Sequence, residues 1–208
     1  EFLQRLRALC DQHGIVLVVD EIQTGAARCG KFFAVEHAGI EPDVITMAKG
    51  LGGGMTISAV IGKAEIMDAA VPGGLGSTYA GHPVAVASAL AVLDVIDEEK
   101  LAERAAALGE KCRARLDAMR SRFPCIADVR GLGAMTAVEF CHDGDPKKPA
   151  GDIATKLKAE AAKRNLLLLN CGSYGNVLRL MLPLTIPESV LDEGMEILEA
   201  SLAAAVGA

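Results

Sequence analysis

The sequence has no tryptophan, and aromatic residues make up only 3% of its 208 residues. Hydrophobic residues nevertheless account for 51% of the chain, so its core must be built mainly from alanine, valine, leucine and isoleucine. That composition is typical of an α/β protein, because buried parallel strands are rich in aliphatic side chains. A chain of this length can form one large domain or two small ones.

Long apolar runs, an excess of positive charge and paired cysteine motifs are also missing. No run approaches the roughly 20 residues of a membrane span, so we expect no membrane contact. Lysine and arginine total 21 against 27 acidic residues, which argues against a nucleic-acid surface. The six cysteines form no C-x-x-C pair and the four histidines show no ligand spacing, so we expect no metal site. We interpret the cysteines as reduced and the compartment as the cytoplasm.

The first hundred residues alternate between helical and strand patterns, which indicates a doubly wound sheet. The chain begins inside an amphipathic helical pattern and without methionine, so we expect a fragment whose N-terminal part is missing. The predicted helix at residues 84–97 is apolar nearly all round, which predicts that it is buried. The predicted strands are residues 15–20, 42–48 and 57–62, and the predicted helices are residues 1–14, 31–39, 63–70 and 84–97.

The second hundred residues have a mixed pattern that suggests a separate α+β domain. We expect domains at residues 1–104 and 105–208. The final helix carries a capping signal, Thr185 followed three residues later by Glu188. The predicted elements are a helix at 99–122, two strands around a Gly-Leu-Gly turn within 126–140, a helix at 152–165, strands at 166–170 and 176–184, and the final helix.

The stretch PDVITMAKGLGGG, residues 42–54, places a lysine after an apolar strand and surrounds it with glycine. The spacing fits neither a phosphate-binding loop nor a dinucleotide fingerprint. Asp20 ends the preceding parallel strand, so Asp20 and Lys49 are expected at one edge of the sheet. A plain salt bridge would explain that pair, but it would not require four glycines. The glycines favour close approach of a bulky ligand to the backbone.

Three segments together resemble class III aminotransferases, which are fold type I pyridoxal-phosphate enzymes. LVVDEIQTGAARCGKFFAVEHAGIEPDVITMAKGLGGG (17–54) resembles the core signature, and GGLGSTYAGHPVAVASALAVLDVI (73–96) resembles the phosphate-contacting loop and its helix. CGSYGNVLRLMLPLT (171–185) looks like the 4-aminobutyrate (GABA) aminotransferase branch. The resemblance implies part of the mostly parallel large-domain sheet, residues 1–104, and the C-terminal small domain, residues 105–208. The segment after the glycines departs from the pattern, with Thr56 where relatives often have proline.

The resemblance implies roles for four residues that surround pyridoxal phosphate. Lys49 would capture the cofactor aldehyde and later move a proton. Asp20 would keep the pyridine nitrogen protonated. Gln23 would bind near the ring hydroxyl, and Ile22 would pack on one ring face, although core packing explains Ile22 equally well. Glu21 has no role that the sequence reveals.

Two further residues gain a role only from the resemblance. Thr78 would reach the phosphate of a neighbouring subunit's cofactor, where a lone loop threonine would otherwise suggest a turn or a helix cap. Arg179 interrupts an apolar strand and would bind the substrate carboxylate as a bidentate pair, with an internal salt bridge as the alternative. The implied enzyme is a homodimer or a dimer of dimers.

The implied reaction moves an amino group from 4-aminobutyrate or a similar ω-amino acid to 2-oxoglutarate. The near alternatives are a 5-aminovalerate or acetylornithine aminotransferase and an aminomutase. An alternative of another class is a catalytically silent fragment that binds partner chains and no cofactor.

Overall fold

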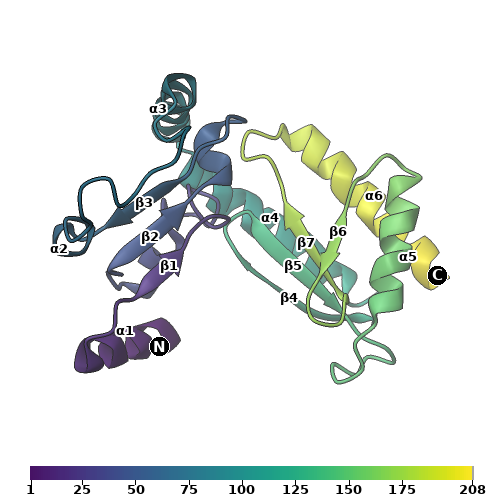
Figure 1. Ribbon diagram of the computed structural model, residues 1–208. Coiled ribbons are helices and arrows are strands. Elements are labelled where there is room, and N and C mark those ends of the chain that lie inside the picture. The colour runs from purple at the N-terminus through teal and green to yellow at the C-terminus, as the bar shows by residue number, and fades with distance from the viewer. Residues whose placement is uncertain (208) are drawn as a thin grey trace. The chain divides into compact units, whose positions relative to one another are not determined.

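The computed structural model describes residues 1–207. The chain forms two compact units, Glu1–Arg104 and Ala105–Ala208. We call them unit 1 and unit 2, and Figure 1 shows the helices and strands of each.

Unit 1 is built on a three-stranded sheet with the order β1-β2-β3. Strand β1 (Val18–Asp20) pairs parallel with β2 (Val44–Met47), and β2 pairs antiparallel with β3 (Ala59–Gly62). The parallel β1–β2 pair and its crossover follow the expected pattern. The remaining elements are α1 (Phe2–His13), the 3₁₀ turns η1 (Ala34–Ala38) and η2 (Lys49–Gly52), α2 (Ala64–Met67) and α3 (Pro83–Glu98).

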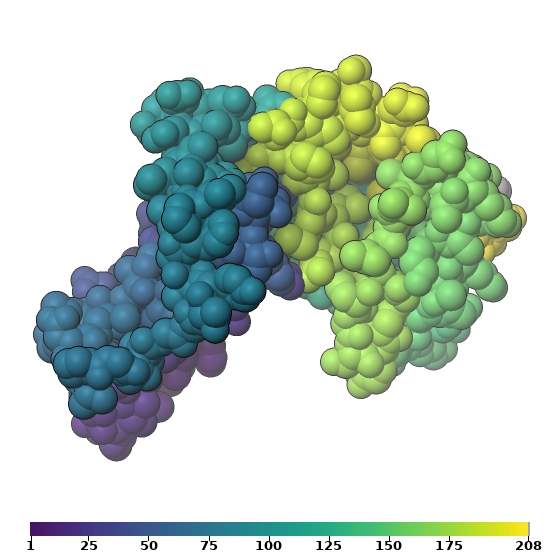
Figure 2. Space-filling view, turned by 45° about the horizontal axis from the view of Figure 1, so that its top comes forward, coloured from purple at the N-terminus to yellow at the C-terminus, as the bar shows by residue number. Residues whose placement is uncertain are grey.

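Two apolar elements of unit 1 are more exposed than their composition suggests. Strand β1 keeps only three residues of the run that begins at Ile15, and Val18 is 54% exposed. Among the described residues this strand pairs only with β2, so one of its edges has no neighbouring strand. Helix α3 buries only Ala85 and Ala89, and Leu90 is 58% exposed. Figure 2 shows α3 and the loop before it, in teal, on the outside of unit 1.

A buried carboxylate links three segments of unit 1 by hydrogen bonds and ion pairs. Asp43, which precedes β2, accepts hydrogen bonds from the Leu17 backbone N–H at 2.7 Å and from Arg7 Nη1 at 2.7 Å. Lys63 Nζ donates to its other oxygen at 2.9 Å. These partners, Lys63 first, hold the pKa of the Asp43 carboxyl well below its usual range. The cluster joins α1, the approach to β1, and the end of β3.

Unit 2 has a four-stranded antiparallel sheet with the order β4-β5-β7-β6. Side chains alternate along β5 and β7, so Val138 and Leu178 face the core, while Ala137 and Arg179 share the opposite face. The three helices pack on the core face, as Figure 1 shows. The elements are α4 (Leu101–Met119), β4 (Ile126–Leu132), β5 (Met135–Phe140), α5 (Gly151–Ala162), β6 (Leu169–Cys171), β7 (Val177–Met181) and α6 (Glu188–Val206).

Several boundaries in unit 2 differ from the expected ones. The run Leu166–Leu168 precedes β6 instead of forming it, and Leu167 is 90% exposed. Helix α6 begins at Glu188, with Pro187 at the N-cap position and no side-chain cap hydrogen bond. The predicted cap at Thr185 is therefore wrong, since the fixed φ of Pro187 starts the helix two residues later. Within residues 1–207, no helix combines the length and apolar character needed to cross a membrane, and all six cysteines are free thiols.

Candidate active site

The carboxyl ends of β1 and β2 lie side by side in unit 1. Asp20, the last residue of β1, is the register partner of Thr46 in β2. The next residue, Glu21, donates its backbone N–H to the Thr46 carbonyl at 2.9 Å. Lys49 follows the end of β2 by two residues. Because parallel strands end at the same sheet edge, the topology brings Asp20 and Lys49 to that edge together.

Lys49 occupies an unusual backbone position beside a pocket. Its φ is 48°, in the left-handed region that residues other than glycine seldom adopt. Its side chain is exposed and lines a cavity of about 610 Å³ within unit 1. The rest of the wall combines small residues with hydroxyl groups: Ala48, Gly54, Met55, Thr56, Ile57, Ser58, Ser77, Tyr79, Ala80, Gly81, His82 and Ala85.

The glycines after Lys49 have two separate physical reasons. A Cβ on Gly53 would lie 2.7 Å from Val92 Cγ2 of α3, and one on Gly52 would lie 3.1 Å from Ile57 Cγ2. Packing inside the chain therefore excludes a side chain at Gly53 and leaves a Cβ at Gly52 only a tight fit against Ile57. A Cβ on Gly50 or Gly54 would meet nothing within 4 Å. The expectation that all four glycines leave room for a ligand thus holds at most for Gly50 and Gly54.

The loop after β1 carries the other predicted residues of this edge. The Ile22 backbone N–H donates to Asp20 Oδ1 at 2.9 Å, which orients that carboxylate. Ile22 and Gln23 are both half-buried. Sequence reasoning missed Glu21, which is 1% exposed and is hydrogen-bonded through both carboxylate oxygens. Its burial could not be read from the sequence, because its partner Val35 comes from a distant part of the loop.

Thr78 lies in the exposed loop before α3. Its neighbours Ser77 and Tyr79 line the Lys49 cavity, whereas Thr78 is not among the wall residues that the structure describes. The structure therefore brings the Thr78 segment, but not the Thr78 side chain, to the cavity of its own chain.

Arg179 belongs to β7 in unit 2. It pairs with Ala137 of β5 on one side and with Leu169 of β6 on the other. Its side chain is half-buried. Arg179 also lines a largely apolar cavity of about 320 Å³ formed by β6, β7 and α6. A guanidinium at this position can bind a carboxylate through two parallel hydrogen bonds.

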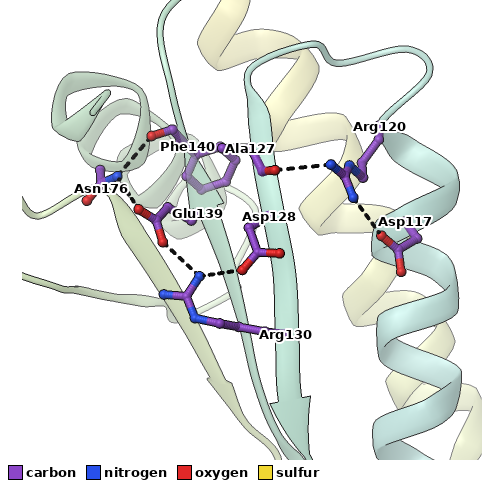
Figure 3. Close-up of polar contacts among 8 residues, drawn as sticks. All are labelled: Asp117, Arg120, Ala127, Asp128, Arg130, Glu139, Phe140 and Asn176. Carbon is purple, nitrogen blue, oxygen red and sulfur yellow. Dashed lines mark hydrogen bonds and ion pairs between the residues drawn. The ribbon is translucent and has the colours of Figure 1, made fainter. Parts of the chain in front are cut away.

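A second arginine occupies the same transverse row of the sheet. Arg130 of β4 is the register partner of Ala137, which lies between Arg130 and Arg179. Figure 3 shows the Arg130 guanidinium between Asp128, at 2.8 Å, and Glu139, at 2.7 Å. These two interactions, the hydrogen bond that Arg130 donates to Asp128 first, raise the Arg130 pKa. Arg130 is thus committed to carboxylates of its own sheet.

Comparison with known proteins gives a consistent result over nearly the whole chain. A family model described as aminotransferase class-III matches residues 1–202. The 5-aminovalerate aminotransferase DavT of Pseudomonas aeruginosa is 56% identical over 197 residues, which are 95% of this chain and 46% of DavT. The 4-aminobutyrate aminotransferase GabT of Escherichia coli is 50% identical over 197 residues, again 95% of this chain and 46% of the relative. The chain therefore spans about half the length of these curated relatives.

Solved structures agree with this result. Ornithine aminotransferase from Toxoplasma gondii superposes with a TM-score of 0.86 at 33% identity, over 99% of this chain and 47% of that chain. That structure is described as showing partial occupancy of PLP at the active site. Acetylornithine aminotransferase from Elizabethkingia anophelis superposes with a TM-score of 0.84 at 36% identity, over 98% of this chain and 51% of that chain.

Proposed function

Because the chain belongs to the class-III aminotransferase family, we propose that it forms part of a pyridoxal-phosphate-dependent aminotransferase. The reaction moves an amino group from 4-aminobutyrate or a similar ω-amino acid to 2-oxoglutarate. Unit 1 is then the C-terminal half of the cofactor-binding large domain, and unit 2 is the small domain. The observation that carries the proposal is Lys49, which lines a cavity at the sheet edge where Asp20 also ends a strand.

The residues of unit 1 fit pyridoxal phosphate by their chemistry. The cofactor aldehyde requires a lysine amine, and Lys49 lines the cavity. The cavity wall is small at Ala48 and Gly54, which leaves room for a ring, and Ser58 and Ser77 provide hydroxyl donors suited to a phosphate. Asp20 offers a carboxylate from the same sheet edge. We assign the cofactor to this cavity.

Each site residue then has a distinct task. When bound, pyridoxal phosphate supplies an electron sink for the substrate carbon. In its uncharged form, the Lys49 amine accepts the proton that leaves this carbon and later returns a proton. The Asp20 carboxylate, oriented by the Ile22 N–H, holds a proton on the ring nitrogen. Gln23 would bind near the ring hydroxyl, and Ile22 would cover one ring face.

Arg179 is assigned to the substrate carboxylate. A guanidinium matches a carboxylate with two parallel hydrogen bonds. The apolar wall around Arg179, which includes Leu169 and Met181, suits the methylene chain of an ω-amino acid. The relatives make 5-aminovalerate a close second candidate, since DavT is more similar to this chain than GabT is. The two substrates differ by one methylene, which a pocket discriminates by only about 10- to 200-fold.

The proposal includes a homodimer with shared active sites. Thr78 is exposed in the loop before α3, so its hydroxyl is accessible to the cofactor of a second subunit. Isologous pairing about a two-fold axis is the commonest arrangement among homo-oligomers. The proposal also places the protein in the cytoplasm, because its free cysteines fit the reducing conditions there.

The first test is covalent labelling. The purified chain is mixed with an equimolar amount of pyridoxal phosphate, reduced with borohydride and mapped by mass spectrometry. We expect the label on Lys49. Lys63, which is ion-paired with Asp43, serves as the internal control for nonspecific labelling. A label distributed over Lys63 and other surface lysines, with none enriched at Lys49, contradicts the assignment.

The second test measures turnover. In a chimera, this chain replaces the matching 46% of DavT, so that a relative provides the remainder. We expect transamination of 4-aminobutyrate or 5-aminovalerate with 2-oxoglutarate, and its loss in Lys49→Ala. If the chimera folds and binds cofactor but transaminates no ω-amino acid, the proposed reaction is wrong. A chimera that folds and binds no cofactor would support the alternative of a silent fragment.

A further inference from the structure

Glu21 is the most deeply buried charged residue that the structure describes, with 1% exposure. Its Oε1 accepts the Val35 backbone N–H at 2.8 Å. Its Oε2 accepts the hydroxyl of Thr24. Its backbone N–H donates to Thr46 of β2, and its carbonyl accepts the Gly25 N–H at 3.0 Å. One residue therefore connects the end of β1 to the neighbouring strand, to the following turn and to the start of η1.

The loop held in this way is closely packed. Val35 is 14 residues from Glu21, so the carboxylate bridges more than half of the crossover between β1 and β2. A Cβ on Gly25 would lie 3.2 Å from the Glu21 carbonyl oxygen, which shows how tightly the turn wraps around this residue. Burial lowers the pKa of Arg28 and raises that of the Cys29 thiol in the same loop. Because Glu21 itself is almost fully buried, water competes little with its hydrogen bonds.

The position of Glu21 determines the direction of Asp20. Successive side chains of a strand point to opposite sides, and Asp20 ends β1 directly before Glu21. Glu21 is buried whereas Asp20 is exposed, as this alternation requires. Anchoring the Glu21 side chain inward therefore turns Asp20 outward to the sheet edge. Gln23 lies between Glu21 and the bonded residues Thr24 and Gly25, so the same bonds restrict its backbone.

We propose that Glu21 is a positioning residue of the candidate active site, whose buried carboxylate orients Asp20 and Gln23 toward the cofactor. The inference rests on the proposed function for the identity of the bound group. The hydrogen bonds themselves do not depend on that function. Glu21 touches neither substrate nor cofactor in this role and acts only through its neighbours.

Hydrogen-bond chemistry distinguishes three substitutions. In Glu21→Gln, the amide oxygen still accepts the Val35 N–H, and the amide NH₂ can donate to the Thr24 hydroxyl, which also serves as an acceptor. In Glu21→Leu, the side chain keeps its bulk but leaves a buried Val35 N–H without an acceptor. Glu36→Leu is the matched control, because Glu36 accepts a backbone N–H of the same loop, from Phe33 at 2.7 Å, but is exposed.

The test combines hydrogen exchange with cofactor binding. Exchange by mass spectrometry on the purified chain should accelerate about 10-fold or more across residues 22–35 in Glu21→Leu and stay near wild type in Glu21→Gln. Cofactor affinity and the pH dependence of its visible absorbance are measured in the chain or in the DavT chimera, whichever binds. Because misplacing a functional group by about 1 Å can cost 100-fold, Glu21→Leu should bind at least ~10-fold more weakly. Its absorbance should resemble that of Asp20→Asn, whereas Glu21→Gln and Glu36→Leu should resemble wild type.

The possible results separate this proposal from the proposed function. Unchanged exchange in Glu21→Leu overturns the anchoring of the loop. Faster exchange with wild-type affinity and absorbance overturns the positioning role and leaves Glu21 as a purely structural residue. If the wild-type protein binds no cofactor, either as the purified chain or in the DavT chimera, the proposed function fails. The positioning role toward that cofactor then fails with it.

Discussion

Two helix glycines in unit 2 should respond to alanine with opposite signs. Gly109 lies in the interior of α4 and Gly194 in the interior of α6. Helix propensity alone predicts that alanine stabilises both positions by up to about 1 kcal/mol. Their surroundings differ. A Cβ on Gly109 would lie 1.7 Å from the Gly133 carbonyl oxygen, whereas one on Gly194 would meet only Leu166 Cδ1, at 4.0 Å.

The expected destabilisation by Gly109→Ala follows from the close approach of Gly109 to the Gly133 carbonyl oxygen. A Cβ normally stays more than 3 Å from backbone atoms, so Gly109→Ala must push α4 and the β4–β5 turn apart by well over 1 Å. Overpacking of this kind typically costs 1–3 kcal/mol, and sometimes more. It also disturbs the hydrogen bond from Arg113 to the Gly133 carbonyl, which is 3.1 Å long. We expect a net loss of about 1–2 kcal/mol for Gly109→Ala and a gain of about 0.5–1 kcal/mol for Gly194→Ala.

Urea unfolding followed by circular dichroism would measure both variants. With a urea dependence of roughly 1–3 kcal/mol per molar, the two midpoints should lie about 1 M apart, on opposite sides of wild type. Equal stabilisation by both substitutions would refute the reasoning, because it would mean that α4 does not approach the β4–β5 turn closely. The Gly194 variant is the internal control for helix propensity.

Three further predictions concern charged residues. Because its partners lower the pKa of Asp43, the stability that this carboxylate adds is complete above its unfolded pKa of about 3.9 and is lost as pH falls toward its folded value. Asp43→Asn should therefore be less stable than wild type at pH 7, with a gap that narrows in urea unfolding below about pH 4; a gap independent of pH would contradict this. Asp20→Asn in the chimera should fold normally yet lose at least ~100-fold in turnover, and near-normal turnover would remove Asp20 from the mechanism. Arg179→Ala should weaken carboxylate substrates by about 10- to 150-fold, from roughly 1.5–3 kcal/mol, and simple amines much less; an equal loss in steady-state kinetics would make Arg179 structural.

The parts of the site that depend on regular strands could be predicted from the sequence. Asp20 and Lys49 each follow an apolar run, and the rule that parallel strands end at one edge is enough to bring them together. Helix α3 was also predicted within one residue at each end. The prediction that this helix is buried was wrong. Apolar composition shows which residues a helix can bury, but not whether neighbouring elements surround it. Only the side with Ala85 and Ala89 is covered among the described residues.

The parts that depend on loop geometry could not be predicted. Glu21 gains its role from Val35, and no periodicity encodes the return of a loop after 14 residues. For the glycines after Lys49, the sequence instead suggested more ligand contact than the structure supports. Their number suggested a ligand, but Gly52 and Gly53 serve contacts with Ile57 and with α3. A glycine cluster can therefore serve both internal packing and ligand access. Only the contacts at each position show which of the two reasons applies to a given glycine.

The distribution of core residues predicts where a cofactor would act on stability. Unit 2 has a large buried cluster of its own, whereas the buried cluster below the candidate site consists of Met47, Leu51 and Ala89. Elements with few buried apolar contacts open at low free-energy cost, so unit 1 should exchange faster than unit 2. A ligand that binds only the folded state at 100 times its Kd adds about 2.7 kcal/mol. Pyridoxal phosphate should therefore slow hydrogen exchange in β2 and η2 while leaving α5 and α6 unchanged. Equal protection of α5 and α6 would show that the cofactor stabilises the chain as a whole rather than through the Lys49 cavity.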